Sequence, residues 1–165
     1  MIDLLLLILI DTNKTPNRRT TMNEKKCEFE TLIYRLRAAG KAQQCAKNLM
    51  LSDFEPTVQL AIERNNLAVA EAGEVRDALW ELYAGDMTPT EHDADLYEMM
   101  LQVIWGIDTK IRDTERSITD NIDNPVLTKY LREKRKEYRN LIDSKIQELL
   151  AFLESKQTVS EILKF

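Results

Sequence analysis

Apolar residues recur every three or four positions along most of the chain, and this spacing predicts long amphipathic helices. The first apolar series starts near Asn23 and runs to about Met50. The second runs from Pro56 to about Ala84 and is followed by Gly85. Proline suits the first turn of a helix, where its missing N–H needs no partner, and glycine is the usual residue just after a helix end. We therefore expect two long helices in the first half of the chain.

Two further apolar series follow, each with a start signal. Thr88 and Glu91 form a capping-box pattern, and the helix they start should end before the polar segment 120–124. Asn124 is a suitable N-cap for a fourth helix, which has proline in its first turn and reaches about Ser155. A last short helical turn is expected after it, since threonine and glutamate are again three residues apart there.

Four helices of about 30 residues joined by short connections must be antiparallel neighbours, because a short connection cannot return along a helix roughly 40–45 Å long. Four glycines and four prolines in 165 residues are too few for a turn-rich β architecture. We expect an all-α, up-down-up-down bundle in residues 22–165. Residues 1–21, an apolar segment and a polar linker, either lie outside the evolved domain or pack on it.

The segment Met1–Ile10 is apolar at every position except Asp3. As a helix it would span about 15 Å, half of what a bilayer core requires. A signal peptide would need a basic start and a cleavage site with small residues, and this segment has neither. We therefore expect no transmembrane span.

The chain has two cysteines and one histidine, which leaves little material for catalysis or metal binding. Cys27 and Cys45 are too far apart on one predicted helix to bridge, so we expect free, buried thiols and a cytoplasmic protein. We expect no catalytic residues, metal ligands or cofactor. An enzyme would have to rely on His92, which stands among acidic residues of a predicted first turn, where they complement the helix dipole.

The third predicted helix carries a second apolar stripe beside its expected core stripe, formed by Tyr97, Leu101 and Trp105 at i, i+4 and i+8. Four occupants could cover it: the segment Met1–Ile10, the C-terminal residues 162–165, a protein partner or second copy, or a small apolar ligand. We predict an interaction surface here. The leading hypothesis is a non-catalytic bundle that acts through protein–protein interaction, as a homodimer or an adaptor.

Charge is unevenly distributed within the net charge of −5. Residues 71–98 have a net charge of −8, and residues 129–139 have a net charge of +4, so we expect a polarised molecule. The alternative hypothesis is a nucleic-acid-binding regulator, although glutamates interrupt the basic stretch. A small-ligand-binding bundle or an enzyme is the third. The predicted phosphate contacts are Lys129, Arg132, Arg135, Lys136 and Arg139.

Overall fold

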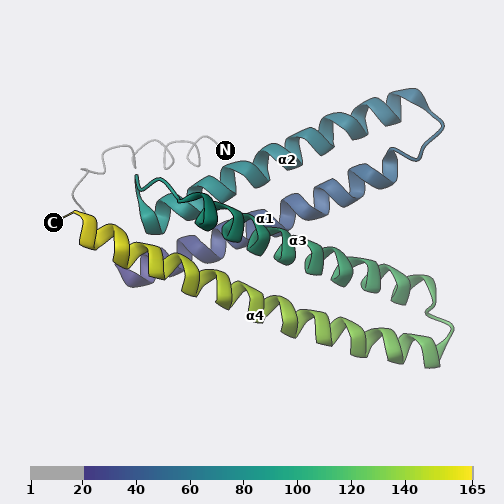
Figure 1. Ribbon diagram of the computed structural model, residues 1–165. Helices are drawn as coiled ribbons and strands as arrows, with labels where there is room; N and C mark the ends of the chain where they lie inside the picture. The colour runs from purple at the N-terminus through teal and green to yellow at the C-terminus, as the bar shows by residue number, and fades with distance from the viewer. Residues whose placement is uncertain (1–20, 165) are drawn as a thin grey trace, which may run out of the picture.

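A computed structural model describes residues 21–164, which form four helices that alternate in direction (Figure 1). They are α1 (Met22–Leu49), α2 (Glu55–Ala84), α3 (Glu91–Asp120) and α4 (Pro125–Leu163). The predicted all-α, up-down-up-down bundle is confirmed. The apolar segment Met1–Ile10 lies outside the described residues. Within them, no helix combines the length and the apolar character needed to cross a membrane.

Local sequence explains where the helices start. At α1, Thr21 and Glu24 form a capping box, in which each side chain bonds the other residue's backbone N–H. At α4, the Asn124 side chain accepts from Leu127 N at 3.1 Å, as predicted. The cap of α3 is Thr90, whose hydroxyl accepts a hydrogen bond from the third residue of the helix.

Two predicted helix ends need correction. Thr88 does not cap α3, because the threonine–acid spacing repeats two residues later and Thr90 makes the cap bond at 3.2 Å. The C-terminal turn is helical, but it continues α4 and does not start anew, so α4 has 39 residues. Thr158 donates its hydroxyl hydrogen to the Glu154 carbonyl within that helix and caps nothing.

The four helices pack as two hairpins, α1–α2 and α3–α4. The hairpins lie against each other at the end that holds the α2–α3 connection, which we call the shared end, and they diverge toward their own turns (Figure 1). Across the hairpins, α1 packs on α3 and α2 packs on α4, and both pairs run parallel. The core is therefore concentrated at the shared end. Its most deeply buried large members are Val75, Leu79, Ile104, Ile142, Leu149 and Leu153.

The predicted core stripe of α3 is confirmed in the second half of the helix, where Ile107, Ile111 and Ile118 are buried. In the first half the buried residues are instead Tyr97, Leu101 and Ile104. Residues of the expected core stripe, such as Met99 and Val103, are exposed. Two polar residues, Asp108 and Thr114, occupy buried positions in the true stripe and conceal it in the sequence.

Asp108 is buried where α3 crosses α1, and two arginines neutralise it. Arg37 Nε lies 2.9 Å from Asp108 Oδ1, and Arg112 Nε lies 2.9 Å from Asp108 Oδ2. Arg112 also donates to the Arg37 carbonyl at 2.8 Å, which ties the two hairpins together. A buried carboxylate is tolerated only when it is paired and hydrogen-bonded in this way.

Beyond the shared end, residues 41–70 of the α1–α2 hairpin form an arm that is packed differently. Its buried hydrophobic residues are all alanines, namely Ala46, Ala61 and Ala68. None of the three belongs to the main core cluster. The Asn65 side chain also buries its oxygen in the arm, where no hydrogen-bond donor of the described residues reaches it. The arm thus has small residues in its interior and a buried polar atom without a hydrogen bond, and both features make it weakly stabilised.

Candidate functional site

The structure covers the predicted interaction stripe inside the molecule. Tyr97 is 5% exposed and Leu101 is 6% exposed, and both belong to the core. Trp105 is half-buried against α1, and its ring lies over Gly40, where an added Cβ would be 3.5 Å from Trp105 Cε2. The Trp105 Nε1 donates to Gln43 Oε1 at 3.1 Å. These side chains therefore form no surface for a partner in the described part of the chain. The helices that cover them, α1, α2 and α4, were not among the predicted occupants.

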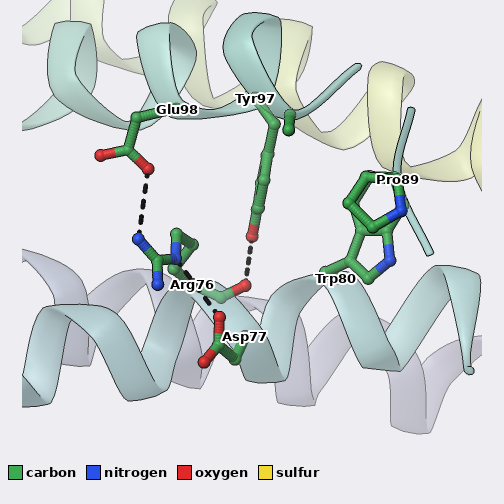
Figure 2. A pocket seen from close by; sticks show the side chains of 7 residues that line it. Arg76, Asp77, Trp80, Pro89, Tyr97 and Glu98 are labelled. Atoms are coloured by element: carbon green, nitrogen blue, oxygen red, sulfur yellow. Dashed lines mark hydrogen bonds and ion pairs between the residues drawn. The ribbon is translucent and has the colours of Figure 1, made fainter. Parts of the chain in front are cut away.

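Tyr97 instead lines a pocket of about 370 Å³ between α2 and α3, beside the connection that joins them (Figure 2). This volume falls within the range of small-molecule sites, roughly 300–1,000 Å³. Its apolar wall comes from aromatic, proline and alanine side chains, and its polar groups are one arginine and two carboxylates. The lining residues are Arg76, Asp77, Trp80, Pro89, Ala94, Tyr97 and Glu98.

The aromatic wall is held in place by the core behind it. The rings of Trp80 and Tyr97 lie 5.6 Å apart, and each also packs on Phe152 of α4. Trp80 Nε1 donates to the Met87 carbonyl at 2.7 Å. The Tyr97 hydroxyl crosses from α3 to donate to the Arg76 carbonyl on α2 (Figure 2). Both aromatic donors are therefore occupied and offer nothing to a ligand.

The charged groups of the pocket share a single cation. Arg76 Nε lies 3.3 Å from Asp77 Oδ1, and Arg76 Nη1 lies 3.5 Å from Glu98 Oε2 (Figure 2). The hydrogen bond with Asp77, and to a smaller extent Glu98, raises the pKa of Arg76. Burial raises the pKa of the Tyr97 hydroxyl, which stays neutral as a donor. One positive and two negative charges give the pocket a net negative rim.

The single histidine does not line the pocket. His92 is exposed in the first turn of α3, and its neighbour Asp93 pairs with Lys156 of α4 at 2.9 Å. That pair lowers the pKa of Asp93. In the described residues, no group of three or more His, Cys, Asp or Glu side chains is arranged to hold a metal ion.

A second candidate surface lies on the arm side of the α1–α2 hairpin, and the sequence analysis missed it. On α1, the side opposite to Gly40 carries the exposed residues Ala38, Ala42 and Cys45. On α2, the neighbouring side carries Leu60, 43% exposed, and Leu67, 70% exposed. We call these five residues the outer face. The seven-residue spacing of Leu60 and Leu67 was the available signal. Each leucine is followed by an alanine and a further apolar residue, so apolar residues face several sides of the helix and the exposed side is not evident from the pattern.

The predicted phosphate contacts lie on α4, toward the α3–α4 turn, and most of them are exposed. Lys129, Arg132 and Lys136 follow each other at i, i+3 and i+7 on one side of the helix and make no ion pair within the described residues. Arg139 continues this side but binds Glu115 of α3 at 2.8 Å. Arg135 is half-buried. The structure thus places Lys129, Arg132, Lys136 and Arg139 in one exposed cationic row near the α3–α4 turn. The acidic segment 71–98 lies toward the shared end.

The two cysteines are free and exposed, so the prediction of buried thiols is wrong. Their positions are on α1 sides that other helices leave open, and Cys45 is part of the outer face. The chain matches no protein-family model, no curated protein and no solved structure.

Proposed function

We propose that the protein acts without catalysis, by binding a second copy of itself through the outer face of the α1–α2 hairpin. The observation that supports this proposal is the packing of the arm. Its buried hydrophobic residues are alanines, while Leu60 and Leu67 remain exposed beside them. Burying a leucine stabilises a protein by about 1.5–3 kcal/mol, several times what an alanine contributes. An arm packed in this way gains most from a surface that covers its leucines.

The outer face carries two large side chains on α2 and three small ones on α1, so two copies of it can fit together. The Arg35–Glu71 ion pair, at 2.7 Å, sets the register of the antiparallel helices on this side. Leu67 lies four residues before Glu71 on α2, so it is level with the stretch of α1 between Ala38 and Ala42, three and seven residues after Arg35. A two-fold axis along the hairpin would place the leucines of one copy on Ala38, Ala42 and Cys45 of the other. Such a paired surface is what a symmetric dimer requires.

The charge of the arm also favours a second copy. Residues 41–70 carry three cationic and three acidic side chains, so two arms bring no net repulsion, unlike the segment 71–98. Two charged residues, Glu63 and Arg64, lie between the two leucines on α2, and Arg64 is the one at helical spacing from both, four residues after Leu60 and three before Leu67. Its aliphatic stem can cover apolar surface while its guanidinium reaches the edge of the interface.

Light scattering on the full chain tests the dimer. We expect twice the mass of one chain at micromolar concentration, a single-chain mass for Leu67→Glu, and an unchanged dimer for Val126→Glu, which places the same charge on another exposed apolar residue. Arg64→Ala should weaken the dimer less than Leu67→Glu does, since it removes only the aliphatic stem of a side chain whose charge lies at the edge of the interface. A parent protein with the mass of one chain throughout, or equal effects of the two glutamate variants, would overturn the proposal.

A second function is favoured by the exposed cationic row of α4. We propose, as the alternative, that Lys129, Arg132 and Lys136 contact the phosphates of a nucleic acid. Fluorescence anisotropy with labelled DNA and RNA at low salt should show binding that weakens as salt rises. Arg132→Glu should reduce it more than Lys41→Glu, an equal charge change on the exposed surface of α1. Binding that is absent at low salt excludes this alternative.

We propose a cytoplasmic location for the protein. Two unpaired, exposed thiols support it, because a reducing compartment keeps such cysteines free. Cells should be lysed directly into denaturant without added reductant, so that Cys45 is also accessible when it lies at the dimer interface. Labelling of Cys27 and Cys45 with a thiol reagent should then give full modification. Disulfide-linked or blocked thiols would contradict it.

A further inference from the structure

We propose that the pocket between α2 and α3 binds an organic cation with a flat apolar body, such as an arylalkylamine. This site is separate from the outer face, since the pocket lies at the shared end and the arm lies beyond it (Figures 1 and 2). The proposal therefore does not depend on dimer formation.

The first argument is the supply of hydrogen-bonding groups. The Trp80 N–H and the Tyr97 hydroxyl both donate to backbone carbonyls, so the wall has no free donor. Arg76 is shared between two carboxylates. Each of these carboxylates uses one oxygen on Arg76, which leaves the second oxygen of Asp77 and of Glu98 as an acceptor. Arg76 keeps N–H groups beyond those that face Asp77 and Glu98, but the free carboxylate oxygens can be satisfied only by a donor such as an ammonium group.

The second argument is the sign of the charge. The rim has a net charge of −1, and it stands within the segment 71–98, whose net charge is −8. A negative potential concentrates cations at the pocket and repels anions. An anionic ligand would have only Arg76, which is already neutralised by its neighbours. The charge of the pocket thus selects an ammonium over a carboxylate or phosphate.

The third argument is the wall itself. Trp80, Pro89 and Tyr97 provide an apolar surface, and Ala94 adds a small apolar side chain on the α3 side. Apolar walls with a few placed polar groups are typical of small-molecule sites, and an ammonium near an aromatic ring gains cation–π attraction. A small inorganic cation would leave this wall unused. The flat apolar body of the ligand would cover it.

Calorimetric titration with 2-phenylethylamine tests the site. The matched probes are 3-phenylpropionate, which keeps the ring but has a negative charge, and butylammonium, which keeps the positive charge but has no ring. We expect binding of the amine, no binding of the carboxylate and weaker binding of butylammonium. Equal binding of the amine and the carboxylate, or no heat from the amine at millimolar concentration, would overturn the proposal.

Variants locate the binding. Ala94→Leu should abolish it by filling the pocket, while Ala70→Leu, on the exposed surface of α2, should leave it unchanged. Glu98→Gln should weaken it about two- to fivefold, as expected for one exposed charge contact. Glu91→Gln changes the same net charge in the first turn of α3, outside the lining. If Glu91→Gln weakens binding as much as Glu98→Gln, the amine responds only to the general field and the site is wrong.

Discussion

At the scale of single residues, the polar groups inside the bundle determine how the hairpins meet. The carboxylate of Asp108 is 4% exposed and binds arginines from both α1 and α3. Sequence analysis predicted neither this site nor the buried side of the first half of α3, because a charged residue at a heptad position looks like a break in the stripe. Only the pairing with Arg37, 71 residues away in the chain, makes that position suitable for a charge.

Removing the buried carboxylate should therefore destabilise the protein. We expect Asp108→Ala to lower the free energy of unfolding by about 2–4 kcal/mol, because it leaves two arginines without their partner, although both reach water in part. Urea unfolding followed by circular dichroism measures this change. The control is Asp113→Ala, on the exposed side of α3. Losses that are equal in the two variants would show that the ion cluster contributes nothing specific.

Tyr83 gives the protein a dependence on alkaline pH. Burial, and then the charges of Glu154 and Glu28, raise the pKa of Tyr83 to about 12. In the unfolded chain a tyrosine ionises near pH 10. Its contribution to stability is therefore complete below about pH 10 and is lost as the pH rises toward 12.

We expect Tyr83→Phe to lose less stability than the parent protein between pH 9 and about 12, because phenylalanine has no proton to lose. Thermal melts across this pH range measure the difference. Tyr34→Phe is the matched control, since Tyr34 is exposed on the same helix pair and should follow the parent protein. Identical pH profiles for the parent protein and Tyr83→Phe would contradict this account.

At the scale of helices, periodicity and caps predicted the elements well, while the choice of buried side failed in the first half of α3. The first-turn prolines, Asn124 and Gly85, whose φ of 59° suits glycine, were reliable because they act through local geometry. The buried side depends on neighbours that are distant in sequence. The first half of α3 has two apolar stripes, either of which could be buried. The stripe that contains Tyr97 is the buried one because Tyr97 packs against Trp80 of α2 and Phe152 of α4.

The buried alanines of the arm, Ala46, Ala61 and Ala68, lead to a prediction on packing. Ala68 is buried between α1 and α2, so Ala68→Leu should force the helices apart and cost about 1–3 kcal/mol of stability. Ala70→Leu adds the same atoms two residues away on an exposed side and should cost little. Urea unfolding compares the two. If Ala68→Leu is as stable as Ala70→Leu, the buried alanines are not closely packed.

At the scale of the whole molecule, two hairpins share one core and diverge from it (Figure 1). Short connections predicted antiparallel neighbours, and charge counts predicted an acidic segment and a basic helix in different parts of the molecule. The crossing of the hairpins was not predictable, since it depends on long-range groups such as Asp108 and Gly40. That crossing separates the arm from the core and leaves its leucines exposed.

Hydrogen exchange of the backbone amides tests most directly whether a second copy stabilises the arm. In the dimer we expect residues 41–70 to be protected, because opening the arm would expose the interface. In Leu67→Glu the same amides should exchange much faster, while those of the core around Leu79 and Ile104 keep their protection. Equal protection of the arm in both proteins would contradict the account, since the arm would then be stable without a partner.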